Sequence, residues 1–95
     1  MLHILLQSPW QCDIAQRLTL LNAGDDLLLL QDGVLAALAQ GEWSERLLNS
    51  PATISVLTED IAARGLSEQI LTNFHLVDYT GFVELTIRHP QQLTW

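Results

Sequence analysis

Lysine is absent from this 95-residue sequence, so four arginines are its only strongly basic side chains. Against eleven acidic residues they leave a formal net charge of −7. A protein that binds nucleic acid needs a cationic surface to release counterions from the phosphates. We therefore expect no direct contact with nucleic acid. The missing lysine also excludes a phosphoacceptor receiver domain, whose mechanism needs that side chain to hold the phosphoryl group.

Other absences narrow the function further. Cysteine occurs once, as Cys12, which excludes an internal disulfide and fits a reducing compartment. No apolar run approaches the roughly 20 residues of a membrane span, and residues 1–6 lack the basic start of a signal peptide. A glycine-rich phosphate loop and a serine nucleophile elbow are also missing. We expect a cytoplasmic protein that has no membrane contact and that neither binds nucleotides through a phosphate loop nor hydrolyses substrates with a serine nucleophile.

Apolar residues, in contrast, are abundant. They make up 48% of the chain, and the mean hydropathy is +0.21. A domain this short hides little more than about 60% of its unfolded surface when it folds alone. The surplus predicts exposed apolar surface and therefore obligate partners. The alternative is a monomer with a leucine-rich core.

The fold class follows from the run Leu27–Leu30, which is typical of a strand buried on both faces of a parallel sheet. Strands and helices are predicted to alternate, with strands at 1–7, 27–30, 53–57 and 74–77 and helices at 9–22, 34–39, 42–49, 59–64 and 81–88. The tail, 91–95, is predicted to form no element of its own. This order predicts an α/β fold with a small parallel sheet flanked by helices, in one domain over residues 1–95.

The first helix carries the only candidate nucleophile. Ser8 is predicted to be its N-cap, with Pro9 at the first helical position. Its sheet-facing stripe is predicted to be Trp10, Ile14, Leu18 and Leu21. Cys12 then lies on the opposite side, exposed or covered by a partner, with its pKa lowered by the helix N-terminus. The competing interpretation is an incidental surface cysteine.

A second candidate site follows the leucine strand. Parallel α/β sheets bind ligands beyond the carboxyl ends of their strands, and Gln31 and Asp32 lie there. A free-standing small-molecule binder is one hypothesis for this end of the sheet. The simpler interpretation makes Asp32 the cap of the next helix.

The three histidines are scattered along the chain. His3, His75 and His89 lack the spacing of metal ligands, so no metal site is expected. His3 and His75 are predicted to be hydrogen-bonded residues within strands. No cofactor-binding motif is recognised either.

Several short motifs occur in register along the whole chain. They are Met1-Leu2-His3, Ser8-Pro9-Trp10, Gly24-Asp25, Leu27 to Val34, Glu59-Asp60, Ala63-Arg64-Gly65-Leu66, Asp78-Tyr79, Phe82-Val83, Leu85-Thr86, His89-Pro90 and Trp95. Together they resemble the TusB/DsrH-like family. The resemblance implies a DsrEFH-like fold with Rossmann- or flavodoxin-like layering.

The resemblance also implies a function. Members of this kind assemble with TusC-like and TusD-like subunits as a dimer of heterotrimers, which relays persulfide sulfur from a TusA-like carrier to a TusE-like carrier for 2-thiolation of the tRNA wobble uridine. DsrH-like relatives of sulfur-oxidising systems carry a cysteine at the position that aligns with Leu18. Because this chain has leucine there, the resemblance implies a structural subunit of a sulfurtransferase complex, with no catalytic residue.

Two alternatives stay open beside this structural role. One is a persulfide carrier that uses Cys12, and the other is the small-molecule binder at Gln31 and Asp32. Aromatic side chains dominate many interfaces, so Trp43, Tyr79 and Trp95 are the candidate interface anchors. For Trp10 we favour a place in the core.

Overall fold

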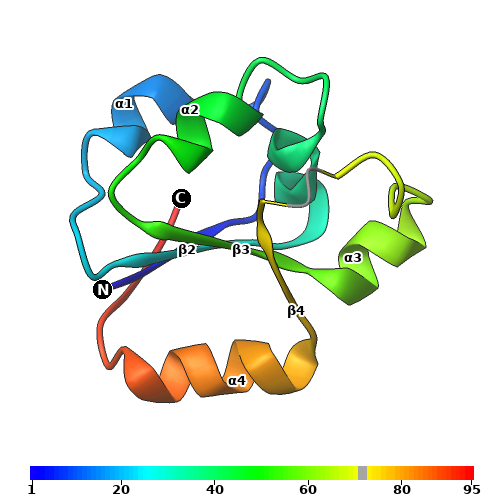
Figure 1. Cartoon of the computed structure of the whole chain (residues 1–95). Coiled ribbons are helices and arrows are strands. Elements are labelled where there is room, and N and C mark those ends of the chain that lie inside the picture. The colour runs from blue at the N-terminus through cyan, green and yellow to red at the C-terminus, as the bar shows by residue number, and fades with distance from the viewer. Residues whose placement is uncertain (71–72) are drawn as a thin grey trace.

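The computed structural model describes residues 1–70 and 73–95, and its centre is a five-stranded sheet with the order β4-β3-β2-β1-β5 (Figure 1). Its strands are β1 (Leu2–Leu5), β2 (Asp26–Leu29), β3 (Thr53–Leu57), β4 (His75–Val77) and β5 (Gln92–Thr94). All four pairings are parallel. The prediction of an α/β fold with a small parallel sheet flanked by helices is confirmed.

The tail contradicts the prediction that it forms no element. β5 pairs with β1 in parallel register, and the backbone N–H of Trp95 donates to the carbonyl of Ile4 at 2.7 Å. Three residues show too little alternation to reveal a strand in the sequence. The strand is fixed instead by the exposed edge of β1, whose backbone groups need partners.

Helices cover the two faces of the sheet unequally. They are α1 (Ile14–Leu18), the 3₁₀ helix η1 (Gln31–Ala37), α2 (Ser44–Leu48), α3 (Thr58–Ala63) and α4 (Tyr79–Arg88). In Figure 1, α1, η1 and α2 lie on one side of the sheet, while α4 lies alone on the other. α3 follows the end of β3 and contacts η1. The short helix predicted at 34–39 corresponds to η1, which begins three residues earlier, at Gln31.

The first helix is much shorter than the predicted span of 9–22. Asp13 is its N-cap, because the Asp13 side chain accepts a hydrogen bond from the backbone N–H of Gln16 at 3.2 Å. At the other end, the hydroxyl of Thr19 donates to the carbonyl of Gln16 at 2.6 Å, a local bond that competes with helix continuation. Trp10 thus precedes the helix and is 70% exposed, so its predicted place in the core is wrong.

The leucine strand is buried on both faces, as predicted. Leu27 and Leu29 belong to the larger apolar cluster, beneath α1, η1 and α2. Leu28 and Leu30 belong to the smaller cluster, beneath α4. The alternation follows from the two-residue period of a strand. One strand therefore supplies both cores.

Candidate functional site

The carboxyl end of the sheet holds an ion pair. Arg64 donates to Oδ1 of Asp32 through Nη2 at 2.9 Å and through Nε at 3.2 Å. The backbone N–H of Gln31, a residue with φ of +50°, donates to Asp60 Oδ2 at 2.6 Å. Asp32 therefore does not cap η1, and that prediction is wrong: the N-cap is Leu30, with no side-chain bond. Both carboxylates are already engaged within the chain.

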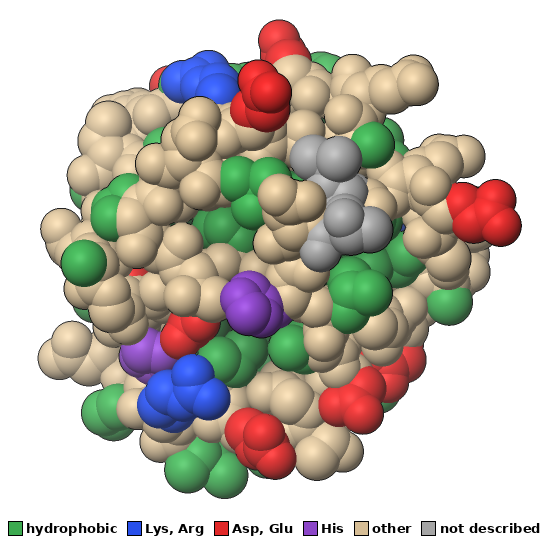
Figure 2. Space-filling model, viewed as in Figure 1, with side chains coloured by type: hydrophobic (Ala, Val, Ile, Leu, Met, Phe, Trp, Pro, Cys, Tyr) green, Lys and Arg blue, Asp and Glu red, His purple; other side chains and the backbone are tan. Residues whose placement is uncertain are grey.

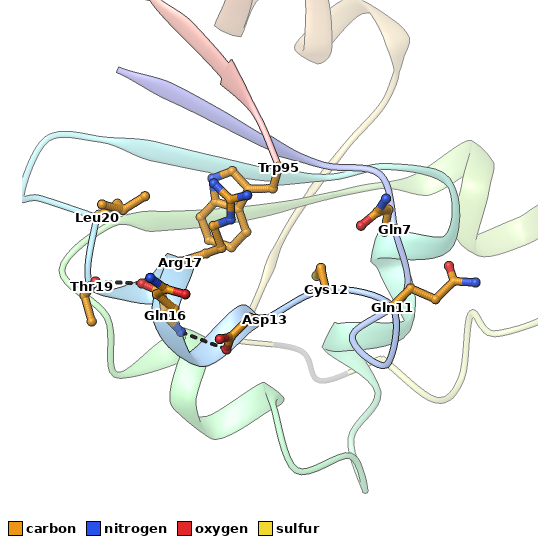
Figure 3. A pocket seen from close by; sticks show the side chains of 9 residues that line it. All are labelled: Gln7, Gln11, Cys12, Asp13, Gln16, Arg17, Thr19, Leu20 and Trp95. Carbon is orange, nitrogen blue, oxygen red and sulfur yellow. Dashed lines mark hydrogen bonds between the residues drawn. The ribbon is translucent and has the colours of Figure 1, made fainter.

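Cys12 borders an open cavity of about 460 Å³ (Figure 3). Side chains from the loop after β1, from α1 and from the C-terminus line it, among them Gln7, Gln11, Arg17 and Trp95. The thiol is half-buried and donates a weak hydrogen bond to the carbonyl of Ser8, with an S···O distance of 3.8 Å.

The electrostatics of this thiol oppose nucleophilic use. Burial raises the pKa of Cys12, Arg17 acts in the opposite direction and Asp13 adds to the rise. The predicted lowering of this pKa is wrong, because α1 begins only at Ile14 and its N-terminus does not include Cys12. Sulfur exchange proceeds through the thiolate. A raised pKa reduces the thiolate fraction at neutral pH.

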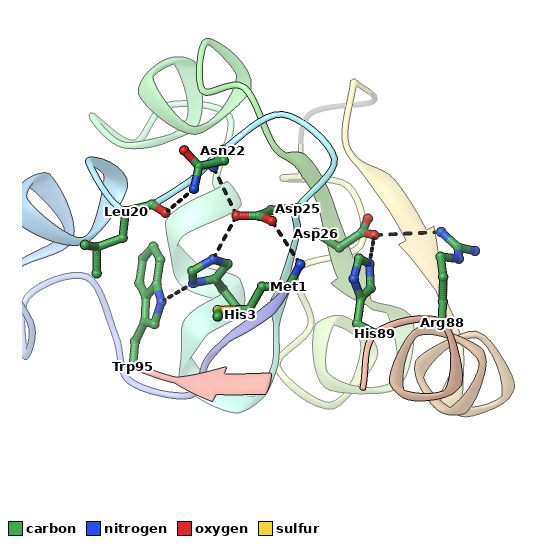
Figure 4. A network of polar contacts seen from close by, with 9 residues as sticks. All are labelled: Met1, His3, Leu20, Asn22, Asp25, Asp26, Arg88, His89 and Trp95. Atoms are coloured by element: carbon green, nitrogen blue, oxygen red, sulfur yellow. Dashed lines mark hydrogen bonds and ion pairs between the residues drawn. The ribbon is translucent and has the colours of Figure 1, made fainter. Parts of the chain in front are cut away.

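A polar network occupies the opposite, amino end of the sheet (Figure 4). The amino group of Met1 donates to Asp25 Oδ1 at 2.9 Å, and the backbone N–H of Asn22 donates to Oδ2 at 3.0 Å. The hydrogen bond from the amino group is the main cause that lowers the pKa of Asp25 to about 2, against the opposing effect of desolvation, with further help from Asn22 and His3. Asp25 thus ties the start of β1 to the turn before β2.

His3 extends this network into the core. Its Nε2 lies 3.2 Å from Asp25 Oδ2, and the indole N–H of Trp95 donates to its Nδ1 at 3.1 Å. Because an indole nitrogen can only donate, Nδ1 must accept, so the hydrogen of a neutral ring is on Nε2 and is donated to Asp25. The ring of His3 is fixed between a carboxylate and a tryptophan, which is a structural role. His3 is in a strand and hydrogen-bonded, as predicted.

A second histidine pairs with the neighbouring carboxylate. Nε2 of His89 lies 2.6 Å from Oδ2 of Asp26, and Arg88 Nη1 lies 3.7 Å from the same oxygen. This links the end of α4 to the start of β2 (Figure 4). The contact spans 63 positions in the sequence, so no local pattern could have predicted it.

The candidate interface aromatics have different environments. Tyr79 is 56% exposed, while Trp95 is buried at 8%. Trp43 is half-buried against the larger cluster, with the guanidinium of Arg46 4.7 Å from its ring centroid. Only Tyr79 offers most of its side chain to a partner.

The described residues contain neither a cluster of metal-binding side chains nor a membrane-spanning helix. Within 1–70 and 73–95, no three histidine, cysteine or acidic side chains gather into a group that could hold a metal ion. No helix in the same ranges is long and apolar enough to cross a membrane. The molecule is thus a small Rossmann-like α/β protein whose polar clusters are used in holding the sheet together.

The chain belongs to the DsrH-like family, whose model, described as "DsrH like protein", matches residues 7–92. It is 52% identical over 95 residues to Protein TusB of Escherichia coli K12, covering 100% of both chains. The same identity and coverage hold for Protein TusB of Yersinia pestis strain Pestoides F.

Two solved structures share the fold. The crystal structure of the ychN protein from E. coli has a TM-score of 0.78 at 17% identity, covering 99% of this chain and 97% of that one. The solution structure of Protein Tm0979 from Thermotoga maritima has a TM-score of 0.69 at 25% identity, with coverage of 96% and 97%. The likeness to the ychN protein extends to the fold alone.

Proposed function

We propose that this chain is a non-catalytic structural subunit of a TusBCD-type sulfurtransferase complex, which relays persulfide sulfur for 2-thiolation of the tRNA wobble uridine. The observation that carries the proposal is the 52% identity, over the full length of both chains, with proteins named TusB. The chain would assemble in the cytoplasm with TusC-like and TusD-like subunits as a dimer of heterotrimers. TusA-like and TusE-like carriers would bring and remove the sulfur.

The environment of the single thiol supports a non-catalytic role. A relay station needs an accessible thiolate that attacks the incoming persulfide. Burial instead raises the pKa of Cys12. Leu18, at the position where some DsrH-like relatives carry a cysteine, packs against the larger apolar cluster. The acidity of the chain also supports a place in the complex without direct contact to tRNA.

Native mass spectrometry tests the assembly. This chain is co-expressed with its TusC-like and TusD-like partners, and the purified species is weighed without denaturation. A hexamer with two copies of each chain is the expected result. A chain that is recovered as a lone monomer from cells that also express both partners would contradict the obligate-partner argument.

A persulfide carrier that uses Cys12 is the second candidate, favoured by the open cavity beside the thiol. The variant Cys12→Ser separates the two roles in a strain whose own copy of the gene is deleted. The structural role predicts wild-type levels of 2-thiouridine in digested tRNA. The carrier role predicts their loss, to the level of the deletion strain.

The third candidate, a free-standing binder at Gln31 and Asp32, has less support. Asp32 is paired with Arg64, and the backbone N–H of Gln31 is bonded to Asp60. Ligand binding there would have to break these bonds or use the groups that remain. A rise in the melting temperature of the isolated chain with a small-molecule ligand would favour this candidate.

A further inference from the structure

The outer flank of α4 carries a row of exposed apolar side chains, which we name the α4 stripe. It consists of Tyr79, Val83 and Ile87, which are 56%, 55% and 76% exposed. Residues four positions apart share one side of a helix, and this row extends for about 12 Å along it. The inner side of α4 also is apolar, because Phe82 and Leu85 belong to the smaller cluster. The helix is therefore apolar on two sides, of which the sheet covers one.

We propose that the α4 stripe is the surface on which a partner subunit docks, through an apolar patch with a basic rim. This inference rests on the proposed function and names the surface that would carry the assembly. A contact of three large apolar side chains, with an aromatic residue at one end, has the composition of an interface core.

The charges beside the stripe determine the chemistry of the partner. Glu59 Oε2 accepts a hydrogen bond from the backbone N–H of Tyr79 at 3.2 Å, so its carboxylate lies at the start of the stripe. Asp78 is the N-cap of α4, and exposed Glu84 follows Val83 directly. In Figure 2, acidic and apolar side chains, with one basic side chain at the left, lie together over the lower part of the molecule, where α4 runs. A basic rim on the partner complements this border.

The same charges argue against a second copy of this chain as the occupant. A two-fold interface places identical patches against each other, so acidic borders would face acidic borders. The chain has little basic surface to offer in exchange. Of its four arginines, Arg64 pairs with Asp32, Arg46 lies over Trp43 and Arg17 is on α1, on the other side of the sheet, which leaves Arg88, 3.7 Å from Asp26, as the one arginine of α4. The net charge of −7 opposes self-association further.

An anionic membrane is disfavoured for a related reason. Amphipathic helices that bind such surfaces carry lysine and arginine on the polar side. α4 has Arg88 as its one basic residue, and Arg88 is already drawn towards Asp26. A protein partner thus fits the border better than lipid headgroups do.

The main experiment compares one stripe variant with a matched control. Ile87→Glu places a charge at the most exposed residue of the stripe, while Leu20→Glu places one at an exposed leucine, 46% exposed, that follows α1 on the other side of the sheet. Each variant is co-expressed with the TusC-like and TusD-like subunits, and the yield of the complex is measured by native mass spectrometry and by titration. Thermal melting of each isolated chain checks that both variants fold.

We expect Ile87→Glu to weaken association at least tenfold with an unchanged melting temperature, and Leu20→Glu to assemble as the wild type does. The variant Glu84→Arg reverses the charge of the border and is expected to slow association and reduce its dependence on salt. These results together would establish both the patch and the sign of its rim.

The other outcomes are distinguishable. A wild-type chain that assembles, together with an Ile87→Glu variant that assembles equally well, overturns this inference and leaves the proposed function intact. A wild-type chain that never joins the partners overturns both. Self-association of the isolated wild-type chain that Ile87→Glu abolishes, seen by analytical ultracentrifugation, would make a second copy the occupant. If the wild-type chain bound anionic vesicles and Ile87→Glu abolished that binding, the occupant of the α4 stripe would be a membrane surface.

Discussion

The two faces of the sheet are built from the same strands but are covered differently. On one face, η1, α1 and α2 enclose the larger cluster, with side chains such as Val34, Ile14 and Leu47 fully buried. On the other, α4 alone covers the smaller cluster. The well-covered face exposes Trp10 and Leu20 only in the segments that flank α1, whereas the thinly covered face ends in a continuous row of apolar side chains, the α4 stripe. The second face is therefore where we propose that a partner docks, on the α4 stripe.

The largest expected loss of stability comes from a substitution that disrupts the packing of the well-covered face. A Cβ added at Gly33 would lie 2.1 Å from the backbone oxygen of Leu5, so η1 would have to move away from β1. We expect Gly33→Ala to lower the free energy of unfolding by about 5 kcal/mol or more, measured by urea denaturation. Gly65→Ala is the control, because its Cβ meets open space and only its φ of +65° is unfavourable; we expect a cost of about 1 kcal/mol. Equal costs would show that the close approach is not tight.

Two adjacent leucines compare the faces directly. Leu28 and Leu29 are both fully buried, but they face the smaller and the larger cluster respectively. We expect Leu29→Ala to cost about 4 kcal/mol and Leu28→Ala about 3 kcal/mol, because a lone helix can settle into a cavity more easily than a packed layer can. Urea denaturation of the isolated chain measures both. If Leu28→Ala proved the costlier, α4 would be held more rigidly than its single layer suggests.

The same two faces show what a sequence can reveal. The run Leu27–Leu30 identified a parallel sheet because burial on both sides leaves no polar position. The apolar positions of α4 were equally visible, but both its flanks are apolar, and no local pattern says which one meets the sheet. Only the packing of Leu85 into the core leaves Val83 and Ile87 outside.

The candidate site was less predictable than the fold. The environment of Cys12 depends on where α1 begins, and two competing caps, Ser8 and Asp13, stand within six residues of each other. The later start removes the predicted lowering of the cysteine pKa by the helix N-terminus, and burial of the thiol raises that pKa. The contact of Trp95 with His3 joins opposite ends of the chain, and that of Asp25 with His3 spans 22 positions. Such separations leave no signal in a single sequence.

The network that joins those ends supplies the next prediction. Trp95→Phe keeps an aromatic ring but removes the indole N–H, which leaves Nδ1 of buried His3 without its donor. We expect a loss of about 1–2 kcal/mol in the free energy of unfolding. Trp10→Phe, at a tryptophan that is 70% exposed, should change it by less than about 0.5 kcal/mol. Both are measured by urea denaturation at neutral pH, and equal effects would mean that the bond to His3 contributes nothing.

The smallest expected effect is a change in the free energy of unfolding that occurs only at acidic pH. It concerns the amino end of the sheet, which both faces share. The pKa of Asp25 falls from an ordinary 3.8 to about 2 in the folded chain, mainly through the hydrogen bond from the Met1 amino group. A folded pKa below the unfolded one means that this stabilisation is complete above pH 3.8 and is lost as the pH falls towards about 2. Asp25→Asn lacks the ionisable group. The stability difference between wild type and Asp25→Asn should therefore be constant near neutrality and shrink across that acid window, as followed by urea midpoints at successive pH values. A difference that stayed constant down to pH 2 would mean that the ionised carboxylate gains nothing from its contacts with Met1 and His3, and that the amino end of the sheet is held by its backbone pairing and by the bond between Trp95 and His3.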